Sequence, residues 1–158
     1  MLIGKKITLR SLKVSDLCFL QSIENNQDNW QFGSENRKFD IQDLLDYIRD
    51  ASIDIEVAKQ YRFVITLNTV PIGLIDLFDY TIVKAGVGVI IKKEYRNKGF
   101  AKEALELLIL YSFKTLKINE LYANIESRNI SSLHLFQSCG FEFRSQESNL
   151  QYFSKLAD

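Results

Sequence analysis

Residues 89–102 read Val-Ile-Ile-Lys-Lys-Glu-Tyr-Arg-Asn-Lys-Gly-Phe-Ala-Lys, so an apolar run gives way to a basic loop and then to a long amphipathic segment. This order predicts a strand, a tight loop and a helix. The first amides of a helix have no intrahelical acceptor, and the helix dipole adds positive charge there, which suits a phosphate. Gly99 lets the backbone approach a ligand closely, while Arg96, Lys98 and Lys102 add positive charge. The stretch therefore predicts a pyrophosphate-binding loop.

The composition is that of an ordinary globular protein, with 46% hydrophobic and 25% charged residues. A length of 158 residues predicts one domain, 1–158. The 20 acidic residues balance the 20 basic ones, which argues against a nucleic-acid partner. The N-terminus lacks the apolar core of a signal peptide, and no segment reaches the roughly 18 apolar residues of a membrane span. We therefore expect a cytoplasmic protein without a membrane partner.

Cysteine and histidine are scarce. Cys18 and Cys139 each lie in an apolar helical pattern, so we expect two buried free thiols and no disulfide or nucleophile. His134 is the only histidine, and its position beside the inward-facing Leu133 and Phe136 favours an exposed or core-edge role. One histidine and two distant cysteines cannot form a zinc site, so no metal is expected.

Periodicity predicts the other elements. Residues 7–12 form a first strand, after which Ser15 caps a helix, and Asp40 caps a second helix that runs to about Ala51. Two β-rich runs flank Asn68-Thr69-Val70 and predict an antiparallel hairpin. The mixture of strands with a crossover helix indicates an α/β or α+β class. Further strands are expected at 62–67, 71–80, 85–91, 121–125, 141–143 and 150–153, and helices from Ala101, with Leu110 on its apolar side, and at 131–139.

The segment from Gln27 to Phe39 has no periodicity but carries three aromatic residues. These wall a substrate cleft or simply pin the loop to the core. Acidic residues around the segment would attract a cationic amine, unless the basic residues among them make it an ordinary solvated surface. The residues concerned are the aromatic Trp30, Phe32 and Phe39, the acidic Glu24, Asp28, Glu35 and Asp40, and the basic Arg37 and Lys38.

Two spaced motifs resemble the GNAT superfamily of N-acetyltransferases. Arg96-x-x-Gly99-x-Ala101 is similar to the family's acetyl-CoA signature, Gln or Arg, x, x, Gly, x, Gly or Ala. Asn129-x-x-Ser132-x-x-x-Phe136-x-x-x-Gly140-Phe141 is similar to a second family motif, Asn-x-x-Ala/Ser-x-x-x-Tyr-x-x-x-Gly-Phe. The order of elements also resembles the GNAT fold over almost the full length. The resemblance implies a mixed, mostly antiparallel central sheet flanked by helices and splayed between its fourth and fifth strands, at 85–91 and 121–125.

The resemblance further implies where acetyl-CoA binds. The pantetheine arm would lie in the splay as an added strand, and the pyrophosphate would meet the loop amides. Asn129 would hold the pantetheine amide, while Ser132 and Phe136 would line the far side of the thioester. An acceptor amine would attack the thioester directly, without a covalent intermediate. The implied cofactor-binding residues are Val89, Ile90, Ile91, Arg96, Asn97, Lys98, Gly99, Phe100, Ala101, Lys102, Asn129, Ser132 and Phe136.

The sequence departs from the family at its proton-transfer positions. The family commonly protonates the leaving thiolate with a tyrosine, where this chain has Phe136, and some relatives use a strand glutamate, where it has Gly86 and Val87. Solvent or the substrate's own proton suffices, or the protein binds coenzyme A without catalysis, or another residue serves. Candidates for the third case are Asp76, Asp79, Tyr80, Glu126 and Ser131, of which we favour Asp76 and Glu126 as catalytic over their alternative as solvated edge residues.

Shorter matches resemble the branch that contains spermidine and ribosomal-protein alanine N-acetyltransferases: Thr8-Leu9-Arg10, Ile72-Gly73 and residues 95–99. We therefore predict an acetyl-CoA-dependent N-acetyltransferase whose acceptor is a primary amine, with a small polyamine-like or other small amine slightly favoured. The alternatives are a protein N-terminal acetyltransferase and a non-catalytic acyl-CoA-binding module. Because many relatives pair through sheet edges or the last strands, the resemblance also implies a homodimer.

Overall fold

The computed structural model describes residues 1–26 and 39–158. Trp30 and Phe32, and with them the question of whether the aromatic segment walls a cleft, lie outside the described residues. The same holds for the charged residues Asp28, Glu35, Arg37 and Lys38.

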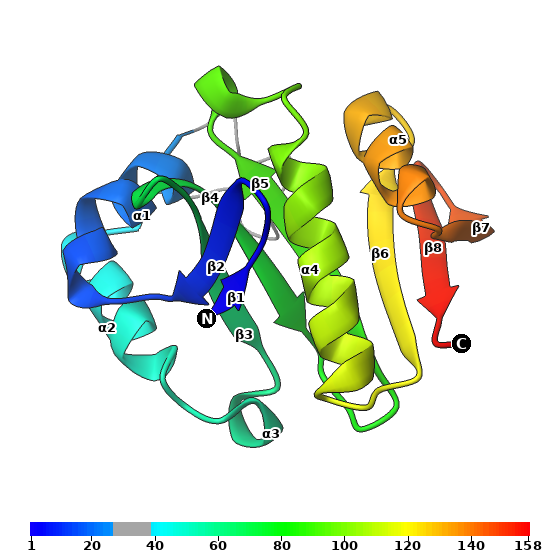
Figure 1. The fold of residues 1–158 in the computed structure, drawn as a ribbon, viewed down its shortest axis with the longest axis horizontal. Coiled ribbons are helices and arrows are strands. Elements are labelled where there is room, and N and C mark those ends of the chain that lie inside the picture. Colours follow the sequence, from blue (N-terminus) through cyan, green and yellow to red (C-terminus); the bar gives the residue numbers. More distant parts are fainter. Residues whose placement is uncertain (27–38) are drawn as a thin grey trace.

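The described strands form one sheet in the order β1-β2-β3-β4-β5-β6-β8-β7 (Figure 1). Every neighbouring pair is antiparallel except β5 and β6, which are parallel. The predicted hairpin at Asn68 and the mixed, mostly antiparallel class are confirmed. The strands are β1 (Leu2–Ile3), β2 (Ile7–Ser11), β3 (Tyr61–Leu67), β4 (Val70–Phe78), β5 (Lys84–Ile91), β6 (Glu120–Glu126), β7 (Glu142–Glu147) and β8 (Leu150–Leu156).

Helices cover both faces of the sheet (Figure 1). Along β3, Phe63 joins the core under α4 and α5, whereas its neighbour Val64 joins the core under α1 and α2, because successive strand residues point to opposite faces. Asp40 caps α2 as predicted, accepting a 2.7 Å hydrogen bond from the Asp43 amide. The helices are α1 (Leu17–Glu24), α2 (Ile41–Asp50), α3 (Ile55–Ala58), α4 (Phe100–Lys114) and α5 (Ile130–Ser138), with 3-10 turns at Val14–Asp16 and Lys93–Tyr95.

The sheet opens between β5 and β6. Their register covers only three residue pairs, from Lys84 opposite Glu120 to Gly86 opposite Tyr122. Beyond these pairs β5 continues to Ile91 and β6 to Glu126 without pairing to each other. The two strands are the fourth and fifth of the sequence prediction, so the predicted splay is confirmed.

Several local predictions are wrong. Ser15 does not cap a helix, since it lies inside the 3-10 turn, and Asp16 is the residue before α1. Cys18 is exposed because the buried side of α1 is formed by Phe19, Leu20 and Ile23. Leu110 is also exposed, since α4 buries a narrower stripe than its apolar sequence suggests. The short elements β1 and α3 were not predicted.

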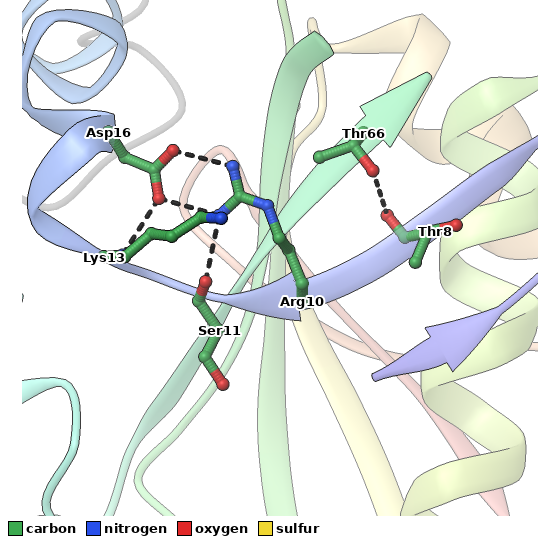
Figure 2. A network of polar contacts seen from close by, with 6 residues as sticks. All are labelled: Thr8, Arg10, Ser11, Lys13, Asp16 and Thr66. Carbon is green, nitrogen blue, oxygen red and sulfur yellow. Dashed lines mark hydrogen bonds and ion pairs between the residues drawn. The ribbon is translucent and has the colours of Figure 1, made fainter. Parts of the chain in front are cut away.

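The connection from β2 to α1 is held by an ion pair whose carboxylate accepts three hydrogen bonds (Figure 2). Arg10 donates to both carboxylate oxygens of Asp16 at 2.8 and 2.7 Å, and the Lys13 amide donates to the same carboxylate at 2.9 Å. Asp16 is only 2% exposed. Burial would raise its pKa, but the hydrogen bonds from Arg10 and Lys13 outweigh burial and leave the pKa of Asp16 below its ordinary value. We call residues Arg10, Lys13 and Asp16 the Arg10–Asp16 corner.

No three His, Cys, Asp or Glu side chains in residues 1–26 and 39–158 are grouped so that they could hold a metal ion. None of the helices in those residues is both long and apolar enough to cross a bilayer.

Candidate active site

A cleft of about 430 Å³ lies beside the splayed end of β5. One wall is the end of the strand, the next is the loop that leads to the first turn of α4, and the third is one side of α5. It is lined by Val89, Ile90, Ile91, Tyr95, Arg96, Asn97, Gly99, Phe100, Ala101, Ser131, Ser132 and Leu135.

The loop into α4 has the backbone of an anion site. Asn97 and Gly99 have positive φ values of 62° and 87°, and Gly99 is the N-cap of α4. Glu103 donates its amide to the Gly99 carbonyl at 3.1 Å, so the amides of residues 100–102 precede the hydrogen-bond ladder of the helix. A Cβ on Gly99 would meet no protein atom within 4 Å, which means that the backbone angle requires the glycine and the space beside it is open.

Arg96 braces the loop rather than projecting from it. Its side-chain Nε donates a 2.8 Å hydrogen bond to the carbonyl of Ile91, the last residue of β5. Lys98 and Lys102 are exposed and do not line the cleft. The loop is therefore built to present backbone amides, with the lysine charges farther out.

The second motif divides between the cleft and the core. Ser132 lines the cleft, and Asn129 caps α5 by accepting hydrogen bonds from the Ser132 amide at 3.3 Å and the Ser131 hydroxyl at 3.2 Å. Phe136 is 3% exposed and packs edge-to-face on Phe141 with ring centroids 5.0 Å apart. Asn129 and Phe136 are thus outside the cleft lining, and their predicted contacts with the cofactor stay predictions.

Three lining residues were not predicted to bind the cofactor. They are Tyr95, Ser131 and Leu135. Ser131 and the predicted Ser132 precede Leu135 by four and three positions, so these residues of α5 share one side of the helix. That helical spacing could have identified Ser131 and Leu135. Tyr95 lies within the opening stretch of sequence, but it carries no charge and is not a fixed position of the acetyl-CoA signature.

Side chains from β4 occupy the space over two glycines of β5. A Cβ on Gly86 would lie 2.4 Å from ring atoms of Phe78, and a Cβ on Gly88 would lie 2.7 Å from Oδ1 of Asp76. The Asp76 carboxylate therefore lies over Gly88, the residue next to the cleft-lining Val89. β5 therefore lacks a carboxylate of its own at Gly86, but the neighbouring strand β4 places the Asp76 carboxylate over β5.

Asp76 belongs to a charged cluster on the face of the sheet covered by α1 and α2. Arg62 is its direct neighbour across β3 and β4. The Arg62 guanidinium is ion-paired with Glu24 and stacks over the Tyr47 ring, 5.0 Å from the centroid. We call Glu24, Tyr47, Arg62 and Asp76 the Arg62 cluster. Glu24, expected to attract a substrate cation, is thus already paired with a cation of the protein.

Burial and charge oppose each other in this cluster. Burial raises the pKa of Asp76 above its ordinary value; the charge of Arg62 opposes this increase, and the charge of Glu24 adds to it. Burial likewise raises the pKa of Tyr47, against the lowering effect of Arg62. Two carboxylates face one guanidinium, so the cluster has a net negative charge when Asp76 is ionised.

Glu126 is the other predicted catalytic carboxylate. It ends β6, its side chain is 37% exposed, and it is ion-paired with Arg128 at 3.3 Å. Like Asp76, it is outside the cleft lining. Of the other candidates, Asp79 is exposed, Tyr80 is buried and Ser131 lines the cleft; His134 is exposed.

Comparison with known proteins identifies the class of enzyme. Residues 6–142 match the family model described as an acetyltransferase (GNAT) domain, so the chain belongs to the GNAT acetyltransferase family. The predicted family and the predicted activity, that of an acetyl-CoA-dependent N-acetyltransferase, are confirmed.

The relatives found in the comparison include spermidine N(1)-acetyltransferases. The chain is 28% identical to that of Vibrio cholerae, over 87% of this chain and 80% of the relative. It is 27% identical to that of Escherichia coli strain K12, over 89% and 75%.

Two solved structures share the fold. The spermidine N-acetyltransferase from Vibrio cholerae in complex with CoA and spermine has a TM-score of 0.85, with 23% identity and coverage of 97% of this chain and 96% of that chain. The N-acetyltransferase PseH of Campylobacter jejuni in complex with acetyl coenzyme A has a TM-score of 0.74, with 18% identity and coverage of 96% and 99%.

Proposed function

We propose that this enzyme acetylates a small polyamine-like amine and that Asp76 contacts the acceptor nitrogen. The observation that carries the proposal is the Asp76 carboxylate over Gly88, which receives no hydrogen bond from any described residue. A partly buried carboxylate without a donor is costly, and a cationic amine supplies both a donor and the missing charge. The spermidine-acetylating relatives support the same class of acceptor.

The chemistry follows from these positions. Asp76 takes a proton from the acceptor ammonium, and the freed lone pair attacks the thioester carbonyl carbon. The carbon–sulfur bond then breaks, an amide forms, and coenzyme A leaves as a thiolate. The second proton of the amine reaches that thiolate through solvent. Because solvent protonates the thiolate, this route needs no side-chain acid at the position of Phe136, which is buried in the core.

The coenzyme A part of the proposal places the pyrophosphate at the amides of the Arg96–Lys102 loop. The Gly99→Val substitution puts a β-branched residue at a φ of 87° and a side chain into the open space. Coenzyme A affinity, measured by calorimetry, should fall at least about tenfold with an unchanged circular dichroism spectrum, since a lost charge-assisted anion contact is worth about that much. Unchanged affinity would place the pyrophosphate elsewhere.

The acceptor is tested by thiol release from acetyl-CoA with spermidine, diamines, amino acids and Ala- or Ser-starting peptides. Turnover confined to polyamines supports the proposal, whereas turnover on peptides alone supports an N-terminal acetyltransferase. Coenzyme A binding without turnover on any amine supports a non-catalytic module. Asp76→Asn and Glu126→Gln, assayed side by side, decide which carboxylate serves the reaction.

We also propose a homodimer, as the family resemblance implies. β7 supports this, because it is a terminal strand of the sheet and all six of its residues are exposed. Sedimentation velocity tests it, and a monomer at micromolar concentration would contradict it. The single domain, the cytoplasmic location and the absence of a nucleic-acid partner stay predictions.

A further inference from the structure

We propose that Arg62 is a positioning residue for the acceptor site: anchored by Glu24 and Tyr47, its guanidinium holds Asp76 as the anionic group at the edge of the cleft. The inference rests on the proposed contact between Asp76 and the acceptor amine. It assigns a task to a charged group that neither the cofactor loop nor the chemistry of the thioester requires.

Arg62 is fixed from both helices that cover this face of the sheet. Glu24 at the end of α1 forms the ion pair, and Tyr47 in the middle of α2 provides the ring under the guanidinium. The Arg62 and Glu24 side chains are only 21% and 26% exposed, so solvent screens the pair weakly. The position of the cation is therefore set by tertiary structure and not by β3 alone.

Arg62 acts on Asp76 through charge. The two residues are opposite each other on β3 and β4, where Cβ atoms are about 5 Å apart. However, the buried Nε of Arg62 has no hydrogen-bond partner in the described chain, and the Asp76 carboxylate extends the other way, over Gly88. Because the carboxylate is not locked to Arg62, it keeps its acceptor capacity for a ligand on the cleft side.

The charged groups that face Asp76 predict opposite effects for two substitutions. Among the described residues they are Glu24 from α1 and Arg62 from β3, with the Tyr47 phenol from α2 beside them, while the residue of β5 under the carboxylate is the uncharged Gly88. Arg62 lowers the pKa of Asp76, so removing its charge should raise that pKa. Glu24 raises the pKa of Asp76, so neutralising Glu24 should lower it.

The experiment is a carbon-13 NMR titration of aspartate carboxyl groups in the full-length chain, with Asp76 assigned from the signal that Asp76→Asn removes. Arg62→Met should raise the pKa of Asp76 by about one unit or more, Glu24→Gln should lower it, and Arg62→Lys should stay near the parent protein. Arg49→Met is the matched control, since Arg49 is a 71% exposed arginine of α2 that pairs with Asp46 and Asp50. It should leave the titration of Asp76 unchanged.

Shifts in the same direction for Arg62→Met and Glu24→Gln, or none in either, would overturn the inference, because a merely structural role predicts a common loss of packing. If Arg62→Met does not fold, Glu24→Gln still tests the inference, because it should lower the pKa of Asp76. The titration needs no turnover, so the two proposals can fail separately. Opposite shifts with no amine acetylated would refute the proposed function and leave only the effect of Arg62 on the charge of Asp76, whereas polyamine turnover without the shifts would refute the role of Arg62 alone.

In active protein the acid limb of the pH profile of kcat/KM for the amine should move to higher pH in Arg62→Met and to lower pH in Glu24→Gln. The KM for acetyl-CoA should stay constant in both variants. Activity requires ionised Asp76 in this scheme, so a higher pKa moves the loss of activity to higher pH. A rise in KM for acetyl-CoA with an unmoved profile would instead assign Arg62 to the shape of the cleft.

Discussion

The Arg10–Asp16 corner and the Arg62 cluster are both arginine–carboxylate groups at the edge of the helices that cover one face of the sheet, yet they are built differently. In the corner, one guanidinium meets one carboxylate through two hydrogen bonds of 2.7 and 2.8 Å, and a backbone amide adds a third (Figure 2). In the cluster, one guanidinium faces two carboxylates, its Nε has no partner in the described chain, and Asp76 has no donor there.

We infer from this difference that the charges of the corner are structural and that those of the cluster serve the proposed function. A buried pair that satisfies all its hydrogen bonds holds a chain turn in place and has nothing left for a ligand. An incomplete cluster costs stability, and such a cost is retained where a ligand completes the set. The corner should therefore matter for folding and the cluster for turnover.

The largest effect is expected from Asp76→Asn. Loss of the proposed proton acceptor should lower kcat/KM for the amine about a thousandfold, within the range for general base groups. The midpoint of thermal unfolding should stay the same or rise, because a buried charge without a donor is removed. Steady-state thiol release and a thermal melt measure both, and a large loss of stability with retained kcat would make Asp76 a structural residue like Asp16.

Asp16→Asn should do the opposite. Removing one partner of the corner leaves the Arg10 charge under-compensated and should cost about 3 kcal/mol in the free energy of unfolding. The kcat of the folded fraction should be unchanged, since the corner does not line the cleft. Urea denaturation measures the first quantity; a loss of kcat without a loss of stability would contradict the contrast between the two groups.

The stability difference between the parent protein and Asp16→Asn should depend on pH. The pKa of Asp16 is lowered in the folded state, so its contribution is complete above the ordinary aspartate pKa of about 4 and is lost as the pH falls through the folded value. Urea midpoints should therefore differ fully at pH 7 and converge below pH 4. A difference that persists at low pH would show that packing, not charge, holds the corner.

Two glycine substitutions on β5 compare the effect of displacing the Asp76 carboxylate with the effect of displacing the Phe78 ring. In Gly88→Ala the new Cβ meets the far end of Asp76 at 2.7 Å, which can move cheaply, so kcat should fall about tenfold with a stability change below about 1 kcal/mol. In Gly86→Ala the Cβ meets the Phe78 ring at 2.4 Å, so stability should fall more than kcat. Equal effects of the two variants on kcat would contradict a specific role for the Asp76 carboxylate over Gly88.

The smallest effect is expected at the exposed pair of Glu126 and Arg128. Arg128→Ala should change the free energy of unfolding by less than about 0.5 kcal/mol, because its side chain is 83% exposed. Turnover should stay within about twofold if Asp76 is the acceptor of the proton. A pronounced shift of the pH profile would instead move the catalytic role to Glu126.

The sequence by itself determined the fold class, the splay and the glycine-containing loop that leads into α4, because these depend on short-range patterns. Alternation, helical spacing and a glycine before an amphipathic helix are local properties, and most residues of the cleft lie within 89–101. Where periodicity was the only guide to orientation it was wrong for Cys18 and Leu110, since an apolar residue on a helix is buried only if a partner covers that side.

Only the tertiary structure decided which carboxylate lies over β5. Glu24, Tyr47, Arg62 and Asp76 come from two helices and two strands, and no local pattern relates their charges. The positions of Phe136 in the core and of Asp76 over Gly88 also follow from packing between distant segments. Charges interact through space, so the pairing that separates the Arg10–Asp16 corner from the Arg62 cluster exists only in the folded chain.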